Sequence, residues 1–222
     1  MILNRIASIK PHHLLDVGCG CGNFTAQIAP YCKFITAIDT SDVWLKRAQN
    51  EQKLSNVKFE KMDAQDISFQ GKTFDVVISR ATLHHVNRWQ QAIDHMLRVS
   101  KNRVLIEEPF DDLRSESRKN TYDVQQFFLE LQNEIGYSHF NHIEPKLVSE
   151  YLKNKGVQFE MEIKKSDDQL DFNDHFGPFD SFVQKSSRKE EWIERYSRLK
   201  EKYAAKEFTA PDTILFSIFL HD

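Results

Sequence analysis

The fold is decided by the stretch Leu14-Leu15-Asp16-Val17-Gly18-Cys19-Gly20-Cys21-Gly22-Asn23-Phe24. An apolar strand runs directly into three alternate glycines and then into a helix. Glycine adopts positive φ and lets the backbone approach a ligand closely, while the N–H groups at a helix start favour a carboxylate or another anion. Because the glycines occupy every second position, the dinucleotide pattern G-x-G-x-x-G is not met.

Apolar runs and helical patterns alternate along the first half of the chain. Strands are predicted at 13–17, 34–39, 57–61, 74–79 and 103–108, and helices at 24–29, 41–52 and 89–99. Strands that alternate with helices form a parallel sheet with helices on both faces, so we expect an α/β fold.

The second half differs in composition, because twelve of the 17 phenylalanines lie after residue 109. We expect one domain over 1–222, with a core at 1–110 and cap segments at 111–143 and 166–208. The elements predicted here are a polar linker at 111–120, helices at 121–134, 145–155 and 187–205, and strands at 157–163 and 213–220.

Composition excludes several classes of protein. With 40% apolar residues the 222-residue chain can bury a core, and a formal charge of -3 provides no field for nucleic acid or anionic lipid. The longest apolar stretch, 214–220, is too short to span a membrane, so we expect a cytoplasmic protein. The three cysteines have neither disulfide nor zinc spacing, and no metal is expected.

Two further acidic residues follow predicted strands at the same sheet edge as the glycines. Asp39 lies 21 positions after Gly18, where a carboxylate can accept hydrogen bonds from both hydroxyls of a ribose. Asp63 follows the third strand and can accept a bond from an adenine amino group. Three loops therefore offer sites for a charged tail, a sugar and a purine.

These motifs resemble those of the class I S-adenosylmethionine-dependent methyltransferases over residues 13–109. The matching segments are Leu14–Gly22, Ala37–Ser41, Met62–Ala64 and Phe74–Ser79. The resemblance implies a Rossmann-like, mostly parallel seven-stranded sheet of order 3-2-1-4-5-7-6 with the last strand antiparallel. It also implies S-adenosylmethionine as the cofactor, bound by Asp16, Gly18, Cys19, Gly20, Gly22, Asp39, Thr40, Trp44, Asp63, Ala64 and Ser79.

The family commonly has a helix or lid of some tens of residues before the glycine motif, whereas about a dozen residues precede it here. We therefore expect the roof of the active site to come from 111–141 and 167–208.

Candidate catalytic residues follow the fourth and fifth strands. His84 or His85 can accept a proton from the methyl acceptor, and Arg80 can bind an anionic substrate group. Glu108 ends the fifth strand and can face the acceptor. The alternatives are structural: packing or capping for the histidines, and a solvated or capping charge for Glu108.

Two aromatic groups in the second half can bind the acceptor. Tyr137, His139 and His142 follow Gly136, and Phe176 and Phe179 lie in the second group. Packing of the cap against the sheet is the alternative for the phenylalanines. His139 and His142 are also spaced for zinc, but this segment is predicted to be a loop without a third ligand.

The leading hypothesis is methyl transfer to an N, O or C atom of a small molecule by a monomer or homodimer. The alternatives are a nicotinamide-dependent oxidoreductase, a non-catalytic partner subunit of the same fold and a methyltransferase for protein substrates. Nucleic acid and membrane partners are not expected.

Overall fold

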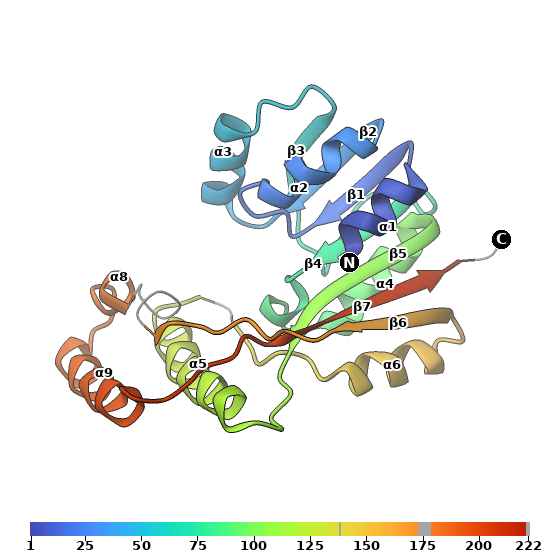
Figure 1. Cartoon of the computed structure of the whole chain (residues 1–222). Helices are drawn as coiled ribbons and strands as arrows, with labels where there is room; N and C mark the ends of the chain where they lie inside the picture. The colour runs from blue at the N-terminus through green and yellow to red at the C-terminus, as the bar shows by residue number, and fades with distance from the viewer. Residues whose placement is uncertain (138, 173–178, 221–222) are drawn as a thin grey trace. The chain divides into compact units, whose positions relative to one another are not determined.

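The computed structural model describes residues 1–137, 139–172 and 179–220 (Figure 1). The chain divides into two compact units. Unit 1 comprises Met1–Glu108, Ile143–Ile163 and Ile214–Asp222, and unit 2 comprises Pro109–His142 and Lys164–Thr213.

A seven-stranded sheet of order β3-β2-β1-β4-β5-β7-β6 organises the fold. The strands are β1 (His13–Val17), β2 (Phe34–Asp39), β3 (Val57–Lys61), β4 (Phe74–Arg80), β5 (Ser100–Phe110), β6 (Gln158–Lys164) and β7 (Asp212–Phe219). The first five pair in parallel. After the end of β7, Leu220 N–H donates to Asn102 O near the start of β5 (2.9 Å), so β7 is antiparallel to β5. The predicted fold class is confirmed.

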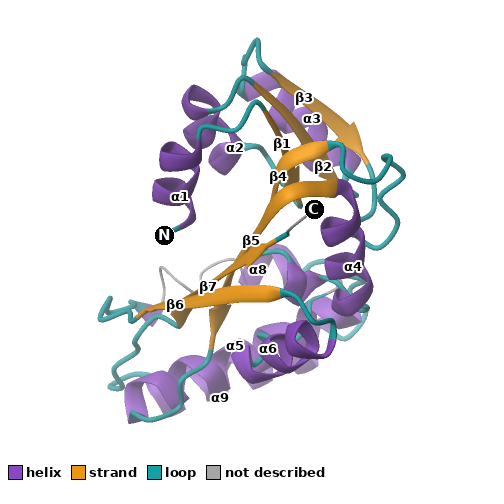
Figure 2. Ribbon diagram, turned by 90° about the vertical axis from the view of Figure 1, so that its right-hand side faces the viewer, coloured by secondary structure: helices purple, strands orange, loops and turns teal. Residues whose placement is uncertain are grey.

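Helices cover both faces of the sheet in unit 1. They are α1 (Ile2–Ile9), α2 (Asn23–Ile28), α3 (Asp42–Glu51), α4 (Trp89–Val99) and α6 (Pro145–Asn154). Figure 2 shows α1 and α2 on one side of the strands and α4 on the other. On the first side, Ile2 and Ile6 of α1 share an aliphatic core with Leu14 and Ile78 of the strands. Alternate strand residues point to opposite faces, so β1 and β4 in the middle of the sheet are buried at nearly every position, whereas β3 and β6 at its edges are more polar and more exposed.

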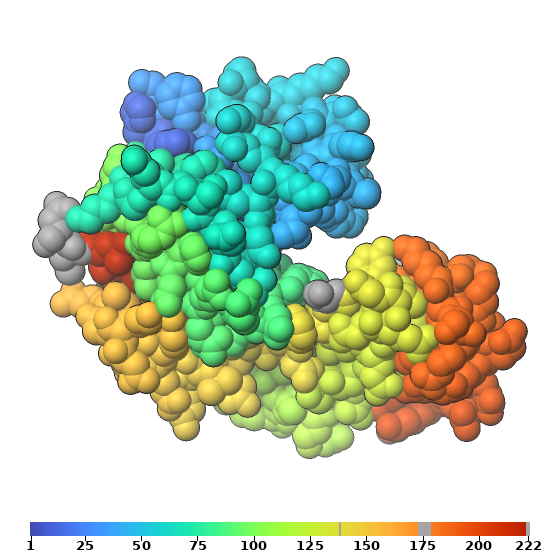
Figure 3. Space-filling view, turned by 180° about the vertical axis from the view of Figure 1, so that it is seen from behind, coloured from blue at the N-terminus to red at the C-terminus, as the bar shows by residue number. Residues whose placement is uncertain are grey.

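Helices α4 and α6 are joined by polar contacts as well as by packing. The Tyr151 hydroxyl donates to Asp94 Oδ1 (2.6 Å), and the Lys155 ammonium lies 2.8 Å from the same oxygen. Trp89 and Tyr151 make an edge-to-face ring contact at 5.5 Å. In Figure 3 the yellow-orange surface of α6 lies against the green surface of α4. The segment 143–163 is thereby fixed within unit 1.

Unit 2 is helical and has an aromatic core. It contains α5 (Glu116–Glu134), α8 (Phe179–Val183) and α9 (Lys189–Tyr203). Phe127, Phe128, Trp192 and Tyr203 are buried together, and Phe179 stacks on Tyr196 with ring centroids 3.9 Å apart. Aromatic rings bury large areas, which lets three helices without a sheet form a core.

The predicted linker at 111–120 is wrong in its second half. Helix α5 begins at Glu116 because the Ser115 hydroxyl accepts the Arg118 N–H (3.3 Å) as an N-cap. No helix in the described residues is long and apolar enough to cross a membrane.

Candidate active site

The glycine loop after β1 is fastened to the end of β2 through the backbone. The N–H groups of Gly18 and Cys19 both donate to Ile38 O, at 2.8 and 3.0 Å. Gly18, Gly20 and Gly22 all have positive φ, between 53° and 77°. Non-glycine residues are disfavoured in this region, so the loop conformation explains the three glycines.

Each glycine has a different neighbour. A Cβ at Gly18 would lie 2.2 Å from Thr82 Cγ2, and a Cβ at Gly22 would lie 3.1 Å from the Phe59 ring. A Cβ at Gly20 would meet no atom within 4 Å. Gly18 and Gly22 therefore allow protein segments to pack closely, and Gly20 is the glycine that faces open space, where a ligand can approach the backbone.

Asp39 at the end of β2 is tied directly to the glycine loop. Its Oδ2 accepts the Gly20 N–H and its Oδ1 accepts the Ser41 N–H, both at 2.9 Å. A carboxylate has about four lone-pair sites, so two remain for other donors. The two backbone bonds fix the carboxylate, and the remaining sites can accept the two hydroxyls of a ribose.

Asp63 lies on the loop next to Asp39. The Met62 N–H donates to Asp39 O (3.1 Å), which joins the loops after β2 and β3. Asp63 is exposed, and its Oδ1 accepts the Gln65 N–H (2.8 Å), while Ala64 is buried. The structure thus brings Asp39, Asp63 and the glycine loop to one sheet edge.

Two polar side chains are buried beneath this edge. Asp16 is 3% exposed and accepts a bond from the Thr25 hydroxyl (2.6 Å), and burial raises its pKa to about 6. Ser79 is fully buried at the end of β4, and its hydroxyl has no hydrogen-bond partner among the described residues. A carboxyl group with a shifted pKa and a buried hydroxyl without a hydrogen-bond partner are both features of functional sites.

The remaining predicted cofactor residues lie at the surface of the same edge. Thr40 is exposed, and Trp44, in the first turn of α3, is 45% exposed. Trp44 is therefore accessible for stacking on a purine. The Cys19 thiol is partly buried, and burial raises its pKa, which keeps it neutral.

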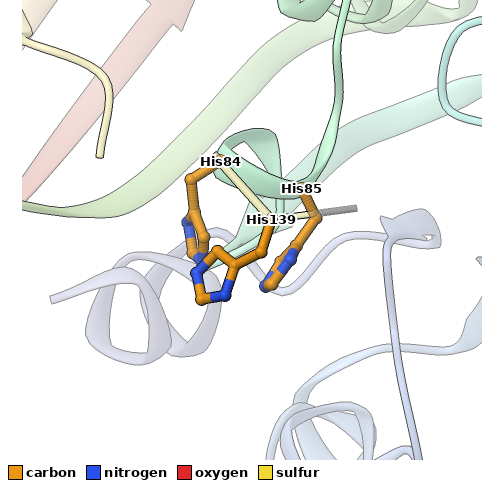
Figure 4. Close-up of side chains that lie close together, drawn as sticks. All are labelled: His84, His85 and His139. Carbon is orange, nitrogen blue, oxygen red and sulfur yellow. The ribbon is translucent and has the colours of Figure 1, made fainter. Parts of the chain in front are cut away.

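Glu108 and His84 form a buried pair after β4 and β5. Glu108 Oε1 accepts the N–H groups of Thr82 and Leu83 (2.8 and 2.9 Å), and its Oε2 lies 2.7 Å from His84 Nδ1. Figure 4 shows His84 and His85 on the same turn, with ring centroids 4.2 Å apart. His84 is buried and His85 is exposed. Glu108 thus caps the turn and orients His84.

Arg80 is paired within unit 1. Its Nε donates to Glu107 Oε1 (3.0 Å), and its guanidinium lies 4.7 Å from the centre of the Phe24 ring. Glu107 is buried and also accepts the Ile2 N–H at the start of α1 (2.8 Å). Arg80 therefore fastens β4 and α2 to the end of β5, and about half of its side chain stays exposed.

The predicted acceptor residues of unit 2 have different surroundings. His139 and His142 line a cavity, whereas the Tyr137 hydroxyl accepts a bond from Lys185 (2.7 Å). Phe179 is 3% exposed within the aromatic core. Phe176 lies outside the described residues. The structure brings the two histidines together and places Phe179 elsewhere.

Sequence reasoning missed the helical wall of this cavity. Gln125, Leu129 and Gln132 of α5 face it. These positions recur at the four- and three-residue spacing of one helix face, which was the available signal. Glutamines on a helix face usually meet solvent, so the spacing alone did not indicate a cavity.

Residues 15–106 match a family model described as a methyltransferase domain. Together with the sheet order, this match indicates a Rossmann-like methyltransferase domain that uses S-adenosylmethionine as its cofactor. The open space at Gly20 and the remaining acceptor sites of Asp39 fit that cofactor.

Among curated proteins, the chain is similar to the methyltransferase YcgJ of Bacillus subtilis, with 27% identity over 93 residues. This alignment covers 40% of the chain and 37% of YcgJ. The chain is 28% identical over 96 residues to a ubiquinone biosynthesis O-methyltransferase of Coxiella burnetii, which covers 42% of this chain and 41% of the relative. The chain thus matches less than half the length of these curated relatives.

Among solved structures, the fold is similar to that of YcgJ from B. subtilis, with a TM-score of 0.70 at 16% identity over 99% of this chain and 98% of YcgJ. It is also similar to a methyltransferase-like structure from Bacillus halodurans, with a TM-score of 0.66 at 18% identity over 98% and 97% of the two chains. At such identities, these similarities concern the fold of the methyltransferase domain and its attached segments.

Proposed function

We propose that the protein transfers the methyl group of S-adenosylmethionine to an N, O or C atom of a small molecule. The observation that carries the proposal is the hydrogen bond from Gly20 N–H to Asp39, because it joins the exposed backbone of the glycine loop to a fixed carboxylate. The loop after β3 extends the same edge to Asp63.

Different residues of the chain would bind different parts of the cofactor. Gly20 and the backbone beside it would hold the methionine part, Asp39 the ribose, and Asp63 with Ala64 the adenine. When bound, S-adenosylmethionine supplies an electrophilic methyl group on a sulfonium. Positioning alone can contribute about 7 to 11 kcal/mol to such a transfer, so a dedicated base is needed only when the accepting atom carries a proton.

The Glu108 and His84 pair can supply that base. Glu108 is a charged acceptor for two backbone N–H groups, so it favours the His84 tautomer with the proton on Nδ1. In that tautomer Nε2 is the proton acceptor of the ring. Glu108 is then a positioning residue for His84, which is the logic of a carboxylate–histidine pair in other enzymes.

Two observations support a small molecule as the acceptor. Unit 2 contains a cavity of about 170 Å³, the scale of a compact organic compound. The Coxiella relative is named for ubiquinone biosynthesis, a small-molecule pathway. We assign the cap segments of unit 2 to acceptor binding on this basis.

The experiment is transfer of labelled methyl from S-adenosylmethionine to a panel of small hydroxyl and amine compounds and, separately, to proteins. Label in the small-molecule fraction supports the proposal. Label only on protein, or none with any acceptor, contradicts it and favours a protein-substrate enzyme or a non-catalytic subunit.

The matched variant is Glu108→Gln, which keeps an oxygen for the turn N–H groups but presents an amide to His84. For an acceptor that carries a proton, kcat should fall about 100-fold with unchanged cofactor affinity, because proton transfer by a positioned base typically contributes this much or more. An unchanged kcat and pH profile would remove the Glu108 and His84 pair from the mechanism.

A further inference from the structure

The cavity of unit 2 is lined by α5 and by the loop 139–142. Gln125, Phe128 and Leu129 of α5 line it, and Phe140 and Phe182 add aromatic walls from the loop and from α8. All of these residues belong to unit 2, so the cavity is a property of that unit by itself.

Hydrogen bonds hold the loop over the helix. The Asn133 side chain donates to His139 O (2.8 Å) and accepts the His139 N–H (3.2 Å). Gln126 Nε2 donates to Asn141 Oδ1 (2.7 Å), and Gln132 Oε1 lies 2.5 Å from His139 Nδ1. A loop tied by four contacts forms the cavity before any ligand arrives, which lowers the entropic cost of binding.

The size of the cavity suits a ligand with a single ring. An engineered protein cavity of about 150 Å³ holds one benzene molecule. At about 170 Å³, this cavity has room for one six-membered ring with a small substituent. Fused ring systems and long chains would extend beyond it.

The charges around the cavity exclude anions. Asp111 is the one acidic residue among the described lining residues, and none of those residues is Lys or Arg. Asp111 Oδ2 lies 3.1 Å from His142 Nδ1, and both side chains are largely buried. The bases in the wall are His139 and His142, and their Nδ1 atoms already contact Gln132 and Asp111. An anionic ligand would therefore lose its hydration next to a carboxylate without a permanently charged basic side chain in the wall. A cationic ligand is also disfavoured, because His142 already contacts the Asp111 carboxylate that would have to bind it.

Gln125 is the polar anchor. Gln125 lines the cavity, and its side chain makes no hydrogen bond within the described part of the chain. A primary amide offers two donors and an acceptor, so it can bond a hydroxyl group as both donor and acceptor.

We propose that the cavity of unit 2 binds an uncharged, single-ring aromatic compound whose hydroxyl group is bonded by Gln125. The proposal rests on the proposed function, in which this compound is the class of methyl acceptor. The proposal restricts the methyl acceptor to uncharged compounds with a single ring.

Fluorine NMR on the full chain tests it with four probes of one ring size. They are para-fluorophenol, fluorobenzene, para-fluorobenzoate and para-fluorobenzylammonium. The phenol should bind at least about tenfold more tightly than each of the others, because it alone combines an uncharged ring with a hydroxyl group. Equal or tighter binding of the benzoate or of the benzylammonium would overturn the proposal.

Variants locate the binding. Gln125→Leu should reduce the affinity for the phenol to that for fluorobenzene, and Gln125→Lys should make the benzoate the preferred probe. Gln184→Leu is the control, because Gln184 is an exposed side chain of unit 2 outside the cavity. Phenol binding that Gln125→Leu leaves unchanged would overturn the proposal.

Calorimetry with S-adenosylhomocysteine on the same samples separates this inference from the proposed function. Variants that bind S-adenosylhomocysteine as the wild type does are folded, so a change in their affinity for a fluorinated probe reflects the cavity. If S-adenosylhomocysteine binds but the phenol does not, the inference about the cavity fails alone. If S-adenosylhomocysteine does not bind to the wild type, the proposed function fails.

Discussion

The two units build their polar surfaces in different ways. In unit 1, Asp39 and Glu108 bind backbone N–H groups, so the carboxylates and the loops fix one another. In unit 2, the loop 139–142 is held mainly by carboxamide side chains such as Gln126 and Gln132. A site made from backbone tolerates few changes, whereas one made from side chains can change residue by residue. The comparison agrees with our proposal that unit 1 binds the cofactor and that unit 2 determines the specificity for the acceptor.

The hydrophobic cores of the two units also differ in composition. Unit 1 has aliphatic residues on a parallel sheet, and unit 2 has an aromatic cluster around Phe127 and Trp192. Branched aliphatic residues suit the regular surface of a sheet, and aromatic rings fill the irregular space between helices.

The largest expected effect comes from the glycine loop. Gly18→Ala should lower the free energy of unfolding by about 4 kcal/mol, because the new Cβ meets Thr82 and the residue keeps a positive φ. Gly20→Ala should cost about 1 kcal/mol, because it adds only the backbone strain. Urea unfolding measures both.

Binding of S-adenosylhomocysteine distinguishes the roles of Gly18 and Gly20 further. Gly20→Ala should weaken S-adenosylhomocysteine binding at least about tenfold despite its near-normal stability, because its methyl group enters the open space. Equal stability losses in the two variants would contradict the assignment of Gly18 to packing and Gly20 to the ligand.

Asp16 should make unit 1 more stable in acid. Burial raises its pKa from 3.8 to about 6, so between these values the unfolded state releases the proton while the folded state keeps it. The contribution of Asp16 to the free energy of unfolding should therefore fall by about 3 kcal/mol as the pH rises through this window, and stay level above it. Asp16→Asn should lack this fall, as urea unfolding at several pH values would show.

Asp75 provides a control of opposite sign. Burial alone would raise its pKa, but bonds from His13 N–H and Lys101 outweigh burial and lower it. Its stabilisation is present above the unfolded pKa and is lost in acid. Asp75→Asn should thus destabilise the protein at neutral pH, and equal pH dependence in the two variants would contradict the account.

A smaller effect than those of Gly18→Ala and Asp16 concerns the core of unit 2. Trp192→Phe removes the indole bond to Glu134 Oε2 (2.9 Å) and part of a buried ring system, so it should cost at least about 1.5 kcal/mol. Trp44→Phe, at an exposed position of unit 1, should change the stability by less than about 0.5 kcal/mol. Urea unfolding compares the two. A larger loss from Trp44→Phe would mean that Trp44 is part of a core.

Much of unit 1 was predictable from the sequence. Strands β1, β2 and β3 begin and end at the predicted residues, because turn-forming residues bound each of these segments. The Gly20 to Asp39 contact follows from adjacent parallel strands whose carboxyl ends share an edge.

Other features depend on contacts between distant segments. Glu108 caps the turn at Thr82 across 26 positions, and nothing local to Glu108 indicates that it binds backbone. Gln125 lines a cavity only because the loop 139–142 folds over α5. Helix α5 started early for a local reason, the Ser115 cap, which the polar composition of the segment obscured.

Isothermal titration with S-adenosylhomocysteine tests the central claim, that the loop edge of unit 1 grips an adenosyl compound through Asp39. The wild type and Asp42→Ala, which loses an exposed ion pair with Lys61 and an acidic side chain in the first turn of α3, should bind equally. Asp39→Ala should bind about 10- to 100-fold more weakly, because bonds to a charged acceptor are lost. Wild-type protein that releases no heat of binding, or Asp39→Ala that binds as tightly as Asp42→Ala, would contradict it.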